Sequence, residues 1–243
     1  MSWVAPVIVA AGAMILILLG RRLDRTVAGS GNPVVALHVR YQPVALLVAL
    51  ASVGLVRLLV PDHADYLAVG DWSASASGLG ILGVADGDSW MTVGLTFLVI
   101  MTAVTALVVW LQVGRGRVSG SAVLLAVPWA VAFSIVNALT EELLFRLTIA
   151  EALGPVLAAG AVALISAVLF GIPHWFGNPG RLPGVLLAGF MGWFLTLSVL
   201  QTGGLGWAWA MHVVPDIVIF TMLVAAAQTA RNRSVSVAAG VTR

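Results

Sequence analysis

The chain has 243 residues, of which 60% are hydrophobic and 9% are charged, whereas soluble domains have about 45–50% apolar and about 25% charged residues. Because so few charged residues cannot cover the surface of a protein in water, the composition excludes a soluble globular protein. It predicts an all-α, polytopic membrane helix bundle in a lipid bilayer. The absence of Cys and Lys excludes disulfide, thiol and lysine chemistry, and the net charge of +2 excludes a basic patch for nucleic acid.

Seven apolar stretches follow one another along the chain, each close to the roughly 20 residues that cross a bilayer. They are residues 4–20, 43–60, 90–113, 121–139, 154–173, 183–200 and 205–227. We therefore expect about seven transmembrane helices. The first is expected to be an uncleaved span, because Arg21 and Arg22 follow it, whereas the charge of a signal peptide precedes its apolar core.

The arginines outside the spans predict the orientation of the chain, because cytoplasmic connections retain positive charge. The loop 61–89 has five Asp and no Arg, so it is expected outside. The N-terminus is then outside the plasma membrane, the C-terminus is cytoplasmic, and the tail 231–243 is expected to be disordered. The arginines on the opposite side are Arg21, Arg22, Arg25, Arg40, Arg115, Arg117, Arg181, Arg231, Arg233 and Arg243.

Ionisable side chains inside the apolar stretches are the candidates for chemistry, because each costs about 2.5–3.5 kcal/mol at mid-bilayer and usually faces the bundle interior. Arg57, near the end of span two, is expected to extend its side chain to the interface. Glu151, beside a Gly-Pro turn, is expected to be solvated, and His38 and His63 are expected in loops without a role. The remaining candidates are Glu141, Glu142, Arg146, His174, His212 and Asp216.

Two adjacent glutamates and an arginine lie in the first candidate segment. Glu142 and Arg146 are four residues apart, on one face of a helix, where they can form an ion pair. Glu141 points about 100° away from Glu142, which leaves it free to face a cavity and act as a general base. From the residues alone, a buried ion pair that only fixes helix packing explains this segment equally well.

Two intramembrane histidines occur close to prolines. His174 follows Pro173, and His212 is one helical turn from Asp216, with Pro215 between them. Each proline removes a backbone hydrogen bond, and irregular helix is tolerated at membrane depth where it lines a polar cavity. In the second run, the carboxylate of Asp216 can orient the imidazole of His212.

The expected depths of these residues in the membrane do not agree. Straight helices counted from the loops place His174 near the inner end of its span, whereas Glu141 and His212 lie closer to the outer side. Two explanations are open. Either the helix bends near Glu141, so that 141–153 runs obliquely, or the limits of the span 154–173 are shifted.

Three motifs occur in order on successive apolar segments: EExxxR at Glu141–Arg146, FxxxH at Phe170–His174 and HxxxD at His212–Asp216. In this order they resemble the CPBP family, the CAAX-processing and bacteriocin-processing (Abi) intramembrane proteases. The resemblance covers roughly residues 120–227. It implies an endopeptidase that cleaves a peptide or a membrane-protein substrate from a site sunk in the bilayer.

The resemblance also implies roles for the ionisable residues. Glu141 and His174 would activate a water molecule for attack on the scissile carbonyl. These two residues and His212 could supply three ligands to a zinc ion with an open fourth position. A glutamate-dependent reaction without zinc fits the same residues, so the sequence does not decide between the two.

The other residues of the three motifs have supporting roles by the same resemblance. His212 and Asp216 would stabilise the oxyanion or help to bind a metal. Glu142 and Arg146 would hold the catalytic helix. The sequence has no HExxH motif, no GxSG motif with a partner histidine and no second intramembrane Asp, which excludes the other known designs of intramembrane protease.

The resemblance divides the chain into three parts. Residues 1–119 form an N-terminal part with three spans and the external loop 61–89. Residues 120–230 form a CPBP/Abi-like catalytic bundle, and residues 231–243 form the tail.

Two alternative functions are open at this point. One is a non-catalytic relative that acts as an immunity or scaffold membrane protein. The other is a small proton-coupled transporter, in which Glu and His form a relay.

Overall fold

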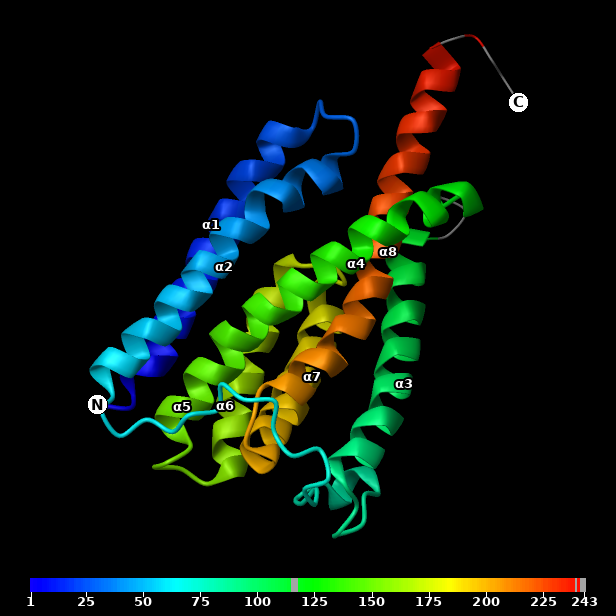
Figure 1. Cartoon of the computed structure of the whole chain (residues 1–243). Coiled ribbons are helices and arrows are strands. Elements are labelled where there is room, and N and C mark those ends of the chain that lie inside the picture. The colour runs from blue at the N-terminus through cyan, green and yellow to red at the C-terminus, as the bar shows by residue number, and fades with distance from the viewer. Residues whose placement is uncertain (115–117, 239, 241–243) are drawn as a thin grey trace.

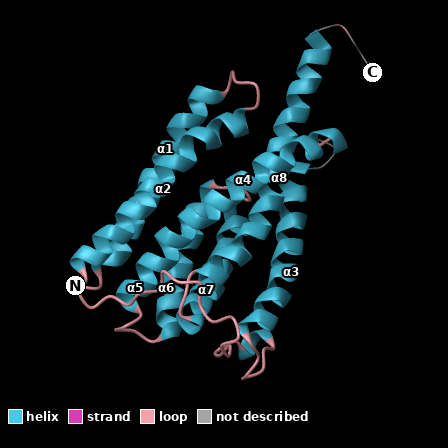
Figure 2. Ribbon diagram, in the orientation of Figure 1, coloured by secondary structure: helices cyan, strands magenta, loops and turns pink. Residues whose placement is uncertain are grey.

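The structure is a computed structural model that describes residues 1–114, 118–238 and 240. It is an elongated bundle of helices (Figures 1 and 2), and the paired extended backbone in the described residues is a single isolated bridge between Ser75 and Ser89. In this part of the chain, seven helices are long and apolar enough to cross a membrane. The prediction of an all-α bundle with seven transmembrane helices is therefore confirmed.

Side chains that cap helices mark several of the helix starts. Asn32, Ser89 and Ser119 each accept a hydrogen bond from the backbone N–H three residues further on, the usual arrangement at a helix N-terminus. A short 3₁₀ turn (η1, Gly80–Leu82) lies in the loop between α2 and α3. One 3₁₀ segment (η4, Ile172–Phe176) and two π-helical segments (η2, Trp110–Gly114; η3, Glu142–Leu147) adjoin α-helices. The α-helices are α1 (Val4–Val27), α2 (Pro33–Leu59), α3 (Trp90–Val109), α4 (Gly120–Glu141), α5 (Thr148–Leu153), α6 (Ala159–Gly171), α7 (Arg181–Thr202) and α8 (Gly206–Ala238).

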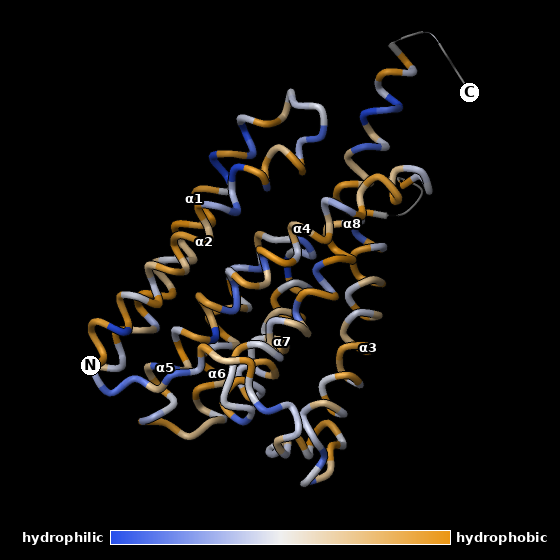
Figure 3. The backbone as a smooth tube through the Cα atoms, in the orientation of Figure 1, coloured by the Kyte–Doolittle hydropathy of each residue, from blue (hydrophilic) through white to orange (hydrophobic). Residues whose placement is uncertain are grey.

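The helices form a bundle with a hairpin at its side. In Figure 1, α1 and α2 run antiparallel on one side of the molecule and α3 lies on the other, while α4 packs along α8 and α6 along α7. The tight approach of α6 and α7 requires Gly192, because a Cβ there would lie 2.9 Å from the Cα of Ala167. Hydrophobic residues predominate along the helices, as Figure 3 shows.

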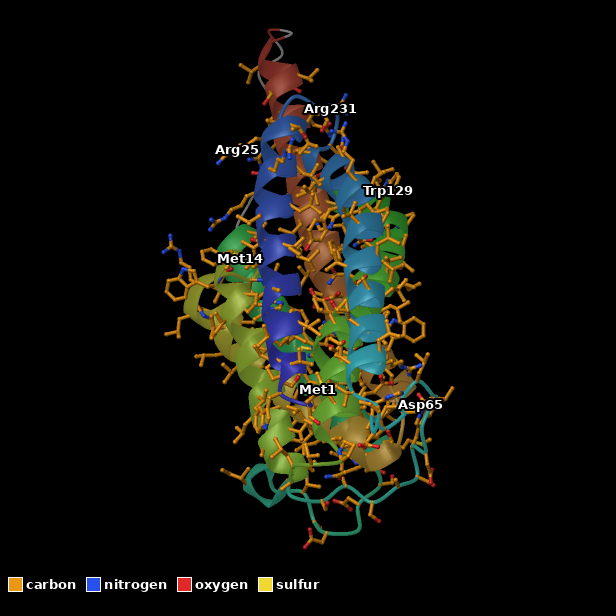
Figure 4. The ribbon with its side chains drawn as sticks, turned by 90° about the vertical axis from the view of Figure 1, so that its left-hand side faces the viewer. Met1, Met14, Arg25, Asp65, Trp129 and Arg231 are labelled. Atoms are coloured by element: carbon orange, nitrogen blue, oxygen red, sulfur yellow. The ribbon has the colours of Figure 1, made fainter. Side chains whose placement is uncertain are left out.

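The two ends of the bundle differ in charge. Met1 and Asp65 lie at one end, and Arg25 and Arg231 lie at the other (Figure 4). This is the arrangement that alternating spans require, and the seven apolar helices indicate an integral membrane protein. Which end faces the cytoplasm stays a prediction. Three of the arginines that contribute to it lie outside the described residues: Arg115, Arg117 and Arg243.

The loop between α2 and α3 folds back over the end of the bundle. The N–H of Ala64 donates to the carbonyl of Glu151 at 3.0 Å, and the N–H of Asp71 donates to the carbonyl of Thr202 at 2.7 Å. These bonds satisfy backbone carbonyls that the ends of helices leave without a partner. The segment 64–71 therefore ties the ends of α5 and α7 together.

Glu151 is not solvated, in contrast to the sequence-based expectation. Its side chain is fully buried, and its Oε2 accepts a hydrogen bond from the Nε of Arg57 at 2.9 Å. Arg57 also donates to Asp65 at 3.0 Å, so it binds two carboxylates instead of extending freely to the interface. The reason is the folded-back loop, which covers the end of α5. The N–H of Leu67, together with Arg57, holds the pKa of Asp65 below its usual value.

Two further expectations were wrong. His38 lies within α2 rather than in a loop, and its ring packs 4.7 Å from that of Phe220 and 5.4 Å from that of Phe133. Helix α8 continues through Ala238, so residues 231–238, expected as a disordered tail, are helical. Both helices extend beyond the apolar stretch that revealed them, because polar residues can continue a helix outside the hydrocarbon.

Candidate active site

A cavity of about 470 Å³ lies between the α1–α2 hairpin and the helices α4, α7 and α8. Glu142 and Arg146 are fully buried and do not line it. The other four candidate residues do, although they come from parts of the sequence that are far apart. The polar residues around its inner part are Asn137, Glu141, His174, His212 and Asp216.

The first motif lies on a widened stretch of helix. The N–H of Thr148 bonds to the carbonyl of Leu143, five residues before it, and its hydroxyl donates to the same oxygen at 2.9 Å. Such π-helical turns contain an extra residue, which changes the direction of neighbouring side chains, and they are frequent at functional sites. Here Glu141 reaches the cavity with 21% of its side chain exposed, while Glu142 is fully buried.

The imidazole of His212 contacts both glutamates. Its Nδ1 lies 2.7 Å from the Oε1 of Glu142, and its Nε2 lies 3.5 Å from the Oε2 of Glu141. An ionised carboxylate can only accept, so Nδ1 donates to Glu142 and Nε2 is directed to Glu141. Asp216, expected to orient this ring, is 3.7 Å from Nε2, beyond hydrogen-bond distance. Glu142 orients His212 instead.

Glu142 also forms the ion pair that its spacing from Arg146 predicts. The Nε of Arg146 lies 3.4 Å from the Oε1 of Glu142, and both side chains are fully buried. The guanidinium of Arg146 stands over the ring of Phe170, with Cζ 3.7 Å from the ring centroid. This cation–π contact links the first motif to the second.

His174 lies on the 3₁₀ turn that follows α6. Its Nδ1 donates to the carbonyl of Phe170 at 2.7 Å, and because a carbonyl can only accept, Nε2 is left for the cavity. The ring centroid of Phe170 lies 4.4 Å from that of His174 and 5.8 Å from that of His212. The ring of Phe170 therefore contacts both imidazoles.

The limits of the fifth span are shifted, as one of the two explanations for the mismatch in depth requires. Helix α6 begins at Ala159 rather than at residue 154, and its helical course continues through η4 to Phe176. The helix that carries Glu141 runs from Gly120 to Leu153, over 34 residues. That is longer than the roughly 20 residues of a straight span, so a position counted from its first residue misjudges the depth of Glu141.

Asn137 belongs to the site, although the sequence-based selection of charged residues omitted it. Its Nδ2 donates to the Oδ2 of Asp216 at 3.0 Å, and its side chain lines the cavity. It precedes Glu141 by four residues on α4, so both project from the same helical face. An amide in an otherwise apolar stretch, one turn before a glutamate, was the available signal.

Residues 122–218 match the family model described as type II CAAX prenyl endopeptidase Rce1-like. We call this part of the chain, which is similar to that family, the Rce1-like segment. It contains all three motifs, so the resemblance to the CAAX-processing protease family is confirmed. Because that family is one of CAAX proteases, the match supports a membrane protease. Neither a curated protein nor a solved structure matches the chain.

The walls of the cavity extend beyond the Rce1-like segment. Tyr41 and His38 on α2 and Leu16 on α1 line it, although both helices precede residue 122. Gly12 of α1 packs closely against Leu144 of the first motif. A Cβ on Gly12 would lie 3.1 Å from the Cδ1 of Leu144. The N-terminal hairpin therefore completes the cavity that the Rce1-like segment begins.

Zinc binding by Glu141, His174 and His212 stays a prediction. The three side chains line the same cavity, and the Nε2 of His212 lies 3.5 Å from the Oε2 of Glu141. The Nδ1 of His212 bonds to Glu142, as the outer nitrogen of a metal-ligating histidine usually does with a carboxylate. Among the described residues, no three His, Asp or Glu side chains are gathered in the arrangement of a metal site.

Proposed function

We propose that this protein is an intramembrane endopeptidase that hydrolyses a peptide bond of a membrane-associated protein or peptide with a water molecule activated by Glu141 and His174. The observation that carries the proposal is the position of His212, 2.7 Å from Glu142 and 3.5 Å from Glu141, in a cavity that His174 also lines. The match to a family of CAAX proteases supports it.

Glu141 is the proposed general base. Its carboxylate reaches the cavity, whereas that of Glu142 is already bonded to His212 and paired with Arg146. The Nε2 of His174, left free by the bond from Nδ1 to Phe170, accepts a hydrogen bond from the same water. As the water oxygen bonds to the scissile carbonyl carbon, its proton passes to Glu141.

The tetrahedral intermediate needs hydrogen-bond donors for its negative oxygen. An ionised Asp216 has no hydrogen to donate to the oxyanion. We therefore propose that Asp216 positions Asn137 and does not contact the oxyanion itself. The Nδ2 of Asn137 donates one hydrogen to Asp216 and has a second one for the oxyanion. A protonated His212 would donate from Nε2, because Nδ1 is engaged by Glu142.

Collapse of the intermediate breaks the carbon–nitrogen bond, and the proton on Glu141 passes to the leaving amine. This step restores the carboxylate and yields a new carboxyl group and a new amine. Glu142 and Arg146 touch none of the reacting atoms, and they hold the widened helix and the ring of His212. The proposal assigns no step to a metal.

The cavity also contains Arg21 and Asp24, near the Arg-rich end of α1. The proposal therefore has the substrate enter from that end. With the orientation predicted from the arginines, this is the cytoplasmic side of the plasma membrane, and the N-terminus is outside. Substrates are then membrane proteins or peptides with a segment exposed to the cytoplasm.

The proposal is tested by quantitative proteomics of membranes from cells that produce either the wild type or Glu141→Gln at equal levels. A precursor that is longer, and more abundant, with Glu141→Gln would be the substrate. The exposed Asp86→Asn in the external loop is the control, and it should give the wild-type pattern. Identical proteomes for all three strains would speak against a protease.

A further inference from the structure

A second crevice opens at the Arg-rich end of the bundle, separate from the active-site cavity. It has a volume of about 380 Å³ and lies where the turn between α1 and α2 meets α4 and α8. None of its lining residues also lines the active-site cavity. It is therefore a separate candidate binding site, distinct from the cavity proposed for the substrate.

The walls of this crevice are apolar and face the membrane. Ala36 of α2, Ala126 of α4 and Val224 of α8 line its base. Leu125 and Trp129 of α4 form its outer edge, and they are 67% and 44% exposed. In a bilayer, exposed apolar side chains on a spanning helix contact acyl chains.

One end of the crevice is polar and lies beside a positive charge. Ser30, Asn32 and Gln228 line it, and none of its described lining residues is acidic. The guanidinium of Arg231 packs against the turn between α1 and α2. A Cβ on Gly31 of this turn would lie 3.2 Å from the Nη1 of Arg231. Figure 4 shows Arg231 at the end of the bundle and Trp129 farther along it, toward the apolar middle.

We propose that this crevice binds one anionic glycerophospholipid, with its phosphate beside Arg231 and one acyl chain between α2 and α4. The charge selects an anionic headgroup, because a basic residue near the membrane surface attracts anionic lipids. The apolar walls select a lipid rather than a free anion. This end of the hairpin is otherwise tied to α8 by the bond from Asn32 to the carbonyl of Val224, at 3.1 Å. The lipid would therefore fasten the α1–α2 hairpin to the bundle.

The test uses the purified full-length protein in a neutral detergent and does not depend on proteolytic activity. Thermal unfolding is measured against increasing phosphatidylglycerol, phosphatidylcholine or glycerol 3-phosphate, and native mass spectrometry counts the bound lipids. The variants are Arg231→Gln, Arg231→Lys and Trp129→Ala. Arg25→Gln is the matched control, because Arg25 is an exposed arginine at the same end, whereas Arg231 packs against Gly31 of the crevice.

We expect phosphatidylglycerol to stabilise the wild type more than phosphatidylcholine does, with one bound lipid per chain. Arg231→Gln should raise the half-saturating concentration about fivefold, the value of one basic residue at a membrane surface. Arg231→Lys and Arg25→Gln should behave as the wild type, and Trp129→Ala should weaken binding. Equal effects of the two lipids would overturn the proposal, and so would full stabilisation by glycerol 3-phosphate or an unchanged response of Arg231→Gln.

Discussion

The Nδ1 of His212 lies 2.7 Å from the Oε1 of Glu142, and this contact gives two adjacent glutamates different roles. Glu142 is fully buried, holds the imidazole and pairs with Arg146. Glu141 reaches the cavity, where its carboxylate lies 3.5 Å from the Nε2 of His212. The widened helix at Glu142–Leu147 contributes to this separation, because it alters the direction of the side chains around it.

The buried pair of Glu142 and Arg146 should matter for stability. Removing one partner of a buried ion pair leaves the other charge uncompensated and typically costs about 3–5 kcal/mol. We therefore expect Arg146→Leu to lower the thermal unfolding temperature in detergent, measured by size-exclusion after heating. The exposed Arg22→Leu is the control and should leave it unchanged. An unaltered unfolding temperature for Arg146→Leu would show that the pair does not stabilise the fold.

Arg57 should also stabilise the fold, because it neutralises the fully buried Glu151. Arg57→Gln should cost about 3–5 kcal/mol by the same reasoning. Asp65→Asn removes only an exposed partner, so its effect should be much smaller, because solvent screens exposed ion pairs. The double variant Arg57→Gln/Glu151→Gln should recover part of the loss, as measured by thermal unfolding. If Arg57→Gln and Asp65→Asn behave alike, Glu151 does not depend on Arg57.

Asn137 should contribute to catalysis rather than to folding. Removing one donor to an oxyanion costs about 10²–10³-fold in kcat, so Asn137→Ala should lose activity to that extent while its unfolding temperature stays near that of the wild type. The measurement is the rate of precursor cleavage by purified variants. Asn232→Ala, at an exposed position of α8, is the control. Wild-type cleavage by Asn137→Ala would remove this residue from the mechanism.

The orientation can be measured with single cysteines, because the chain has none of its own. An impermeant maleimide applied to intact cells should label Ser75→Cys in the external loop and should not label Ser234→Cys near the end of α8. Both positions are exposed. Labelling of Ser234→Cys alone would reverse the orientation and place the cavity mouth outside.

The number of spans could be predicted from the sequence, and so could the ionisable residues that lie inside the bundle, because both depend on local composition. Apolar length determines a span, and a charge inside a span is costly enough to be informative. The pairing of Glu142 with Arg146 also followed from a four-residue spacing. These features need no knowledge of how the helices pack.

The features that could not be predicted depend on packing between distant segments. Glu151 was expected to be solvated, but the loop 61–89 covers it and Arg57 of α2 reaches it. Asp216 was expected to orient His212 because it is one turn away, yet Glu142 from another helix lies closer. Asn137 carries no charge, so it was not selected by the free-energy cost of placing a charged side chain in the membrane. In each case the nearest partner in space was not the nearest in sequence.

The proposed reaction depends most directly on the carboxylate of Glu141. The decisive measurement is the rate at which purified, folded Glu141→Gln cleaves the precursor, compared with the wild type and with the exposed Asp86→Asn. Glutamine keeps the shape of the side chain but cannot take a proton from water, so we expect the rate to fall by about 10²–10⁴-fold. Asp86→Asn should cleave as the wild type does. A folded Glu141→Gln that cleaves at the wild-type rate would contradict the proposed mechanism.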